Sequence, residues 1–138
     1  MKTKIPDGSK LLSREDFKKL CFERDNHTCV FCDKEATAAH HILERKLFSD
    51  GGYYLNNAAS VCDEHHIECE KTTIPLEVVY KACNIQDPKL PEGFSFEFRY
   101  DKWGNEIINE NKRIPGQLFN DTAVQKIFKE QGMMWIFY

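Results

Sequence analysis

The segment CVFCDKEATAAHHILERKLFSDGGYYLNNAASVCDEHH, residues 29–66, decides how this chain folds. It contains three of the six cysteines and four of the five histidines. Cys29 and Cys32 are separated by two residues, and Cys62 and His65 have the same spacing. Two such pairs supply the four sulfur and nitrogen ligands of a tetrahedral zinc ion. The sequence therefore predicts a structural Zn²⁺ site at Cys29, Cys32, Cys62 and His65.

Three histidines, His40, His41 and His66, are left over when this zinc site is complete. If a helix begins at Asp63, His65 and His66 differ by about 100° around its axis. His65 can then face the zinc ion while His66 faces a second centre. A neutral imidazole accepts a proton from water near neutral pH and also binds divalent cations. We therefore expect a catalytic site beside the structural one.

The composition is that of a soluble globular protein of one domain, or of a compact domain with an appendage. The chain has 138 residues, of which 41% are hydrophobic and 30% charged. We expect a cytoplasmic protein with no membrane partner, because no apolar run approaches ~20 residues and the N-terminus lacks a signal-peptide core. A net charge of −3 lowers the expectation of nucleic-acid binding without removing it.

Cysteine placement favours metal binding over a disulfide framework. Cys21, Cys69 and Cys83 occur singly within expected helices, whereas the other three cysteines belong to the histidine-rich segment.

Periodicity and turn residues predict an α+β fold. Four helices are expected. The first covers residues 13–24 and is capped by Ser13, and the second covers 63–71. The third follows a cap at Thr73 and has Pro75 in its first turn, and the fourth covers 121–131. A strand is expected at 36–43, and residues 53–61 return as a second strand or a loop. A hairpin of residues 94–100 and 106–108 follows, around a turn at 103–105. Strand, turn, strand and helix then form a ββα unit held by zinc. We expect a linker near residues 84–92. It divides the chain into a domain at residues 1–83, which holds the zinc site, and a C-terminal extension at residues 84–138.

Two further expectations concern side-chain placement. In a regular strand His40 and His41 point to opposite faces, so we expect the chain to bend or twist if both serve one site. The apolar terminus, residues 133–138, is expected either to pack as a strand or to meet a partner.

Five motifs follow one another along the chain: Cys29-x-x-Cys32, Ala39-His40-His41-Ile42, Gly51-Gly52, Asn57 and Cys62-x-x-His65-His66. Together they resemble the zinc-containing subset of the HNH endonucleases, whose ββα-metal fold holds one catalytic divalent ion. The resemblance covers roughly residues 13–73 and says nothing of residues 84–138. His65 occupies a position where cysteine is more usual, and histidine is an acceptable zinc ligand there.

The resemblance implies a role for each matched residue. His41 resembles the general base, His40 and His66 resemble the two catalytic metal ligands, and Asn57 resembles the asparagine that constrains the loop. The implied reaction is hydrolysis of a DNA phosphodiester with one divalent cation, Mg²⁺, Mn²⁺ or another, leaving 5′-phosphate and 3′-hydroxyl ends. The alternative is a noncatalytic zinc module that binds nucleic acid or a protein partner.

Four cations are candidates for phosphate contacts. Arg45 either clamps a phosphate or is solvated. The same two interpretations apply to Lys18, Lys19 and Arg24 of the first expected helix.

Overall fold

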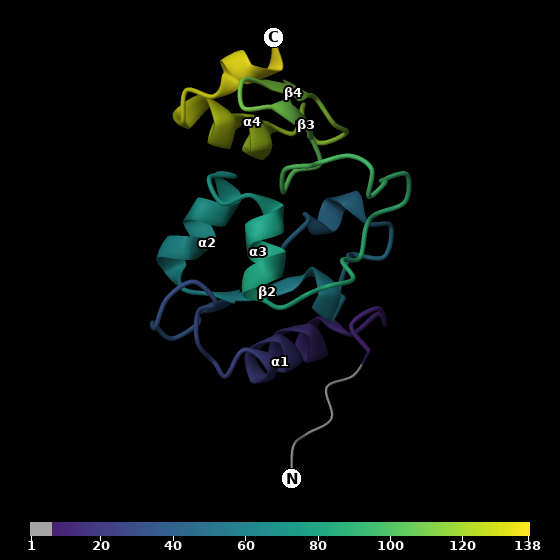
Figure 1. Cartoon of the computed structure of the whole chain (residues 1–138), viewed down its shortest axis with the longest axis vertical. Coiled ribbons are helices and arrows are strands. Elements are labelled where there is room, and N and C mark those ends of the chain that lie inside the picture. The colour runs from purple at the N-terminus through teal and green to yellow at the C-terminus, as the bar shows by residue number, and fades with distance from the viewer. Residues whose placement is uncertain (1–6) are drawn as a thin grey trace.

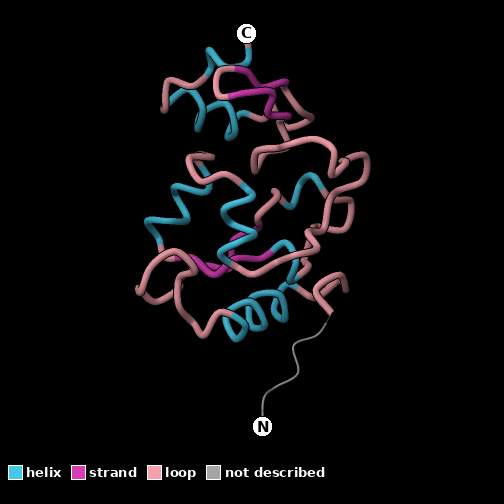
Figure 2. The backbone as a smooth tube through the Cα atoms, viewed as in Figure 1, coloured by secondary structure: helices cyan, strands magenta, loops and turns pink. Residues whose placement is uncertain are grey.

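The computed structural model describes residues 7–138. Figures 1 and 2 show helices, short strands and long connecting loops, which confirms the expected α+β class. The elements in chain order are α1 (Arg14–Arg24), β1 (Ala38–His41), the 3₁₀ helices η1 (Arg45–Leu47) and η2 (Leu55–Asn57), β2 (Ala58–Val61), α2 (Asp63–Glu70), α3 (Leu76–Ala82), β3 (Glu106–Asn109), β4 (Lys112–Ile114), α4 (Thr122–Glu130) and η3 (Met134–Phe137).

Strands β1 and β2 form an antiparallel pair in which Ala38 lies opposite Val61 and His41 lies opposite Ala58. Helix α1 covers one face of this pair, and α2 and α3 lie on the other side (Figure 1). Phe17 and Cys21 of α1 form a small core on their face. The larger core on the opposite side includes residues of β2, α2 and α3. The strand pair is therefore buried between helices, and β1 runs between α1 and α2.

Helices α1 and α2 begin where the sequence predicts. The Ser13 hydroxyl accepts a hydrogen bond from the Asp16 backbone N–H at 3.1 Å and caps α1. Helix α2 begins at Asp63, directly after Cys62, and carries His65 and His66 in its first turn. As adjacent residues of one helix, His65 and His66 therefore point in different directions, as the sequence predicts.

Helix α3 begins later than expected, so the predicted cap at Thr73 is wrong. Pro75 is the N-cap residue, with extended backbone angles of φ −62° and ψ 151°, and the helix begins at Leu76. A proline disfavours helical geometry in the residue before it, because its ring clashes with that residue's backbone. This keeps Ile74 out of the helix, so the helix begins after the predicted cap at Thr73.

The predicted strand at residues 94–100 is also wrong. The segment is irregular, with a turn at residues 96–98, and only Tyr100 forms an isolated bridge, to Glu106. Strand β3 instead pairs with β4, so the hairpin lies one element later in the chain. The alternating aromatics gain no partner strand: Phe94 packs on Tyr100, while Phe96 and Phe98 are 70% and 52% exposed.

The C-terminal helix and terminus form a second cluster, at the end of the molecule opposite α1 (Figure 1). The Asp121 carboxylate caps α4 by accepting hydrogen bonds from the backbone N–H groups of Ala123 and Val124. Ile136 and Phe137 are buried against this helix. The terminus therefore packs on its own chain, as a 3₁₀ helix rather than as the expected strand.

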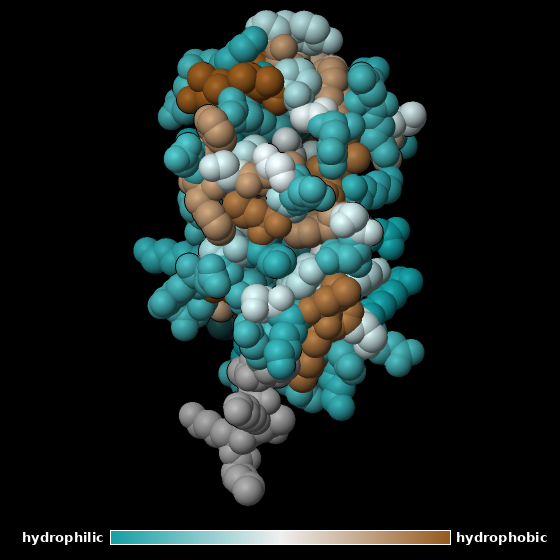
Figure 3. Space-filling model, turned by 90° about the vertical axis from the view of Figure 1, so that its right-hand side faces the viewer, coloured by the Kyte–Doolittle hydropathy of each residue, from teal (hydrophilic) through white to brown (hydrophobic). Residues whose placement is uncertain are grey.

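The extension beyond residue 84 packs on the first part of the chain. Ile85 belongs to the main core, and Leu90, Phe94 and Tyr100 pack against it. The predicted boundary near 84–92 stays a prediction. On the face shown in Figure 3, apolar side chains form several separate patches among polar ones. None of the helices in residues 7–138 is both long and apolar enough to cross a membrane.

Candidate metal sites and cleft

The four predicted zinc ligands converge on one point. Ligand atoms of Cys29, Cys32, Cys62 and His65 all lie within 4.8 Å of one another. The Sγ atoms of Cys32 and Cys62 are 3.8 Å apart, and His65 Nδ1 lies 3.6 Å from Cys29 Sγ and 3.2 Å from Cys62 Sγ. A tetrahedral zinc site has edges of about 3.8 Å between sulfurs and about 3.6 Å between sulfur and nitrogen. These residues are therefore positioned to bind a metal ion of the size of zinc.

The surroundings of Cys62 favour its thiolate form. A hydrogen bond from the backbone of His65 is the main cause that lowers the pKa of the Cys62 thiol to about 6. Cys62 also lies at the N-terminus of α2, where helix geometry stabilises negative charge. The backbone N–H of Phe31 points at Cys29 Sγ from 3.5 Å. The donor set and its environment thus fit zinc, while Cys21, Cys69 and Cys83 are buried free thiols elsewhere.

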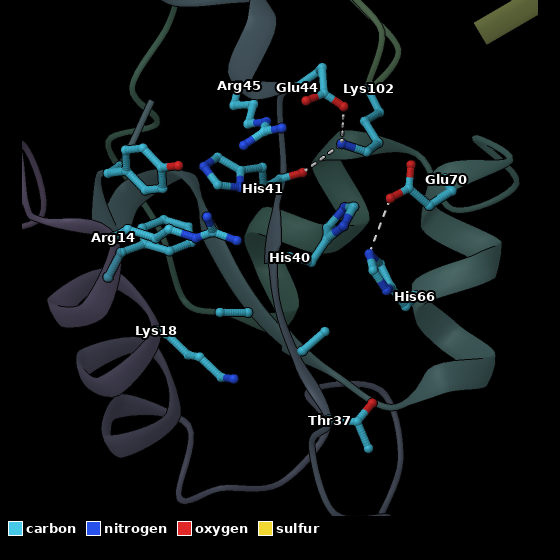
Figure 4. Close-up of a pocket in the computed structure, with 14 residues that line it drawn as sticks. Arg14, Lys18, Thr37, His40, His41, Glu44, Arg45, His66, Glu70 and Lys102 are labelled. Carbon is cyan, nitrogen blue, oxygen red and sulfur yellow. Dashed lines mark hydrogen bonds and ion pairs between the residues drawn. The ribbon is translucent and has the colours of Figure 1, made fainter. Parts of the chain in front are cut away.

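A cleft of about 400 Å³ lies beside this site, between α1, β1 and α2. His40, His41 and His66, the three histidines left over from the zinc site, all line it (Figure 4). The remaining lining residues are Arg14, Phe17, Lys18, Thr37, Ala38, Ala39, Glu44, Arg45, Tyr53, Glu70 and Lys102. The leftover histidines therefore share one cavity.

The two adjacent histidines reach this cleft without the bend that the sequence led us to expect. His40 lies on the α2 side of β1, where its ring centroid is 5.2 Å from that of His66. His41 lies on the α1 side, where it stacks on Phe17. The cleft extends past β1 to both sides, so opposite strand faces open into the same space (Figure 4).

A second group of possible metal ligands lines this cleft. Ligand atoms of His40, His66 and Glu70 lie within 4.8 Å of one another, and His66 Nε2 is 3.1 Å from Glu70 Oε1. His40 is 2% exposed, and neither of its ring nitrogens has a hydrogen-bond partner in residues 7–138. Buried polar groups are rarely left unpaired. A metal ion bound between these residues would supply the missing partner.

Electrostatics keep these ligands in the forms that bind cations. Burial lowers the pKa of His40 well below its ordinary value, and the charge of Lys102 lowers it further, so the ring is neutral. Burial alone raises the pKa of Glu70, but the hydrogen bond from His66 and the charge of Lys102 outweigh it. The Glu70 pKa therefore lies below its ordinary value and the carboxylate is ionised.

His41 is held by aromatic side chains. Its ring stacks on Phe17 with centroids 4.5 Å apart and meets the edge of Tyr53 at 5.1 Å. Its Nε2 atom is buried and has no hydrogen-bond partner within the described part of the chain. Burial first, and the charge of Lys102 second, lower the pKa of His41 to about 4. The ring is therefore neutral and fixed in orientation.

Asn57 lies beneath the cleft rather than in its lining. Its Oδ1 accepts a hydrogen bond from Leu43 N at 2.8 Å, and its Nδ2 donates to Leu43 O at 3.0 Å and to Gly52 O at 3.2 Å. The residue is fully buried. Its side chain therefore ties the end of β1 to the loop that leads into β2.

The predicted phosphate contacts divide into two groups. Arg45 and Lys18 are exposed and line the cleft. Arg14 of α1, which was not predicted, lines it beside Lys18. Arg24 does not: its guanidinium donates to the carbonyls of Leu55 and Ala58 at 2.8 and 2.7 Å and pairs with Asp25. For Arg24 the phosphate interpretation is wrong, because its donors are used within the fold.

Sequence reasoning missed several residues that line the cleft, among them Glu70 and Lys102. Glu70 lies four residues after His66, a spacing that places both on one side of a helix. That spacing was available in the sequence. Lys102 comes from the extension, and no motif connects it to the histidines.

No protein-family model, curated protein or solved structure matches this chain. The chemistry assigned to the cleft therefore rests on its own side chains.

Proposed function

We propose that this chain is a metal-dependent endonuclease of the HNH type that hydrolyses phosphodiester bonds of DNA. The observation that carries the proposal is the buried His40 ring, whose two nitrogens are unpaired beside His66 and Glu70. The unpaired Nε2 of His41 lies in the same cleft. A metal site and a neutral imidazole that share a cleft are the two parts that such hydrolysis needs.

His40, His66 and Glu70 are the residues that would hold the catalytic divalent cation. Two imidazoles and a carboxylate suit several divalent metals, including Mn²⁺ and Mg²⁺. When bound, the cation would stabilise the negative charge that develops on phosphate and leaving-group oxygens. Zinc at Cys29, Cys32, Cys62 and His65 would have a separate, structural role.

His41 would act as the general base. Its Nε2 accepts the proton of a water molecule while the water oxygen forms a bond to phosphorus. The bond from phosphorus to the 3′ oxygen breaks and that oxygen takes up a proton from solvent, which leaves 5′-phosphate and 3′-hydroxyl ends. Burial and the charge of Lys102 lower the pKa of His41 to about 4. A bound phosphate anion raises it again, which favours proton transfer in the substrate complex.

Cationic side chains of the cleft supply a binding surface for the phosphate backbone. Arg14 and Lys18 line it from α1, and Arg45 lines it from η1 (Figure 4). The net charge of −3 makes this local arrangement more important, because the chain as a whole does not attract DNA. Asn57 would keep the loop beneath the cleft in place.

A plasmid-nicking assay with the purified protein tests the proposal. Cleavage is measured with Mg²⁺, Mn²⁺ and other divalent ions, for the wild type and for His41→Asn. The variant is expected to lose at least about 100-fold in rate, which is the smaller end of a general base's contribution. Zinc content and melting temperature are expected to stay unchanged, because His41 is not a zinc ligand.

His27→Asn is the matched control. His27 is the remaining histidine, is exposed, and lies outside both metal-ligand groups. Asparagine also tolerates the positive φ of 59° at this position. This control is expected to cleave like the wild type. If His41→Asn cleaved as fast as His27→Asn, His41 would not be the general base. If no metal supported cleavage by the wild type, the chain would instead be a noncatalytic zinc module.

A further inference from the structure

A turn in the C-terminal extension is held rigid from within. The Asp101 carboxylate is buried and accepts hydrogen bonds from the backbone N–H groups of Trp103 and Asn105, from the Asn105 side chain and from Arg113, at 2.8–3.0 Å. Gly104 has a φ of +84°, which glycine adopts without strain. The sequence predicted only a turn, at residues 103–105. The internal hydrogen bonds of segment 101–105 make it a firm base for the side chains between them.

The first of these side chains reaches β1. Lys102 is 3% exposed, and its ammonium donates to the backbone carbonyl of His41 at 3.1 Å. The same ammonium pairs with Glu44 Oε2 at 3.4 Å, and the Glu44 backbone N–H donates to the Lys102 carbonyl at 3.0 Å. His41 is the last residue of β1. The turn therefore holds the strand at the residue that carries the candidate base.

The second side chain reaches α2. Trp103 is buried, and its Nε1–H donates to the backbone carbonyl of Glu70 at 2.8 Å. Glu70 is the last residue of α2 and a candidate metal ligand. This one turn thus contacts the last residue of β1 and the last residue of α2, the two elements that carry the candidate metal ligands. A two-stranded sheet is only marginally stable by itself, so these elements need such support.

We propose that Lys102 and Trp103 are positioning residues of the nuclease centre, so that the C-terminal extension completes an active site whose reacting groups all lie before residue 84. Lys102 fixes the position of His41, and Trp103 fixes the position of Glu70. This proposal rests on the proposed nuclease function. It assigns the extension a role that no motif of the sequence indicates.

The two residues are expected to affect different quantities. Loss of the Lys102 ammonium frees the His41 backbone and removes a positive charge near the metal ligands. Because His41 is then less well positioned, kcat is expected to fall about 10–100-fold. Because the loss of a positive charge does not weaken cation binding, the Kd for Mn²⁺ is expected to stay within about twofold. Loss of the Trp103 N–H frees the end of α2. The affinity for Mn²⁺ is then expected to fall about tenfold.

The test uses the full chain with Lys102→Met, Lys102→Met combined with Glu44→Gln, and Trp103→Phe. The double variant keeps the test valid if the single variant unfolds, because it leaves no unpaired carboxylate in place of the buried pair. Phenylalanine keeps the apolar ring of Trp103 and removes only its donor. Binding of Mn²⁺ is measured by calorimetry, and kcat and KM are measured by plasmid nicking.

Asp121→Asn is the matched control. Asp121 pairs with Lys46 at 3.1 Å, and that pair also joins the extension to the first part of the chain, but away from the cleft. Asparagine keeps the helix cap. This variant is expected to retain wild-type kcat, KM and Mn²⁺ affinity.

The proposal is supported if kcat falls in the double variant with KM retained, and if Trp103→Phe weakens Mn²⁺ binding. It is overturned if the double variant keeps wild-type kcat, if only its KM rises, or if Trp103→Phe binds Mn²⁺ like the control. A wild type that binds Mn²⁺ without cleaving DNA contradicts the nuclease function alone. The calorimetry of Trp103→Phe then still decides whether the turn positions the metal ligands.

Discussion

Replacing Asn57 by aspartate should destabilise the fold far more than the same change at Asn56. The two side chains are nearly identical in shape to their replacements, so the substitution changes only charge and hydrogen bonding. Asn57 is fully buried and donates from Nδ2 to the carbonyls of Leu43 and Gly52. Asn56 donates once, to Asp87 O, from an exposed position.

The magnitude follows from the contacts that are lost. Asn57→Asp removes two hydrogen bonds of about 1 kcal/mol each and places a carboxylate oxygen against two carbonyl oxygens in a buried site. The free energy of unfolding is expected to fall by roughly 3–5 kcal/mol, which corresponds to a melting temperature lower by roughly 10–20 °C. For Asn56→Asp the expected change is below about 1 kcal/mol.

The pH dependence has a definite sign. The unfolded-state pKa of the new carboxyl is about 3.9, and burial against carbonyl oxygens raises its folded-state pKa. The destabilisation is therefore full above the folded-state pKa and shrinks as the pH falls through it, because the protonated acid donates to one carbonyl. Thermal unfolding of both variants followed by circular dichroism measures this. Equal melting of the two variants at about pH 8 would refute the role assigned to Asn57.

Three further outcomes are expected. Cys29→Ser should abolish zinc binding and unfold the first part of the chain, because metal-binding energy is folding energy in such sites; unchanged melting, with or without a chelator, would contradict this. Glu70→Gln should weaken Mn²⁺ binding at least about tenfold, measured by calorimetry, with zinc content unchanged; equal affinity would remove Glu70 from the ligand group. Arg45→Gln should raise KM up to about fivefold with kcat retained, because an exposed ion pair contributes at most about 1 kcal/mol; a fall in kcat alone would assign Arg45 another role.

Local patterns in the sequence were sufficient for the parts of the fold that depend on local geometry. The spacing of Cys29, Cys32, Cys62 and His65 predicted a ligand group that the structure brings within 4.8 Å. Ser13 marked the start of a helix because its side chain caps a backbone N–H group that has no partner within the helix. Each of these signals is local, because the two ligands of each pair, and likewise Ser13 and Asp16, are three positions apart.

Features that depend on distant partners were not predictable in the same way. The alternation of Phe94, Phe96, Phe98 and Tyr100 has the period of a strand, but a strand also needs a neighbour, and β3 pairs with β4 instead. The contacts of Lys102 with His41 and of Trp103 with Glu70 join residues 61 and 33 positions apart. A single sequence contains no local pattern for such contacts.

The most direct measurement of the central claim is the anomalous X-ray scattering of a crystal of this protein grown with zinc and soaked in Mn²⁺. Data collected on both sides of the zinc edge distinguish the two metals. We expect a zinc peak within the Cys29, Cys32, Cys62 and His65 group, and a manganese peak between His40, His66 and Glu70. A crystal with zinc bound and no manganese at His40 would contradict the account of a second, catalytic centre.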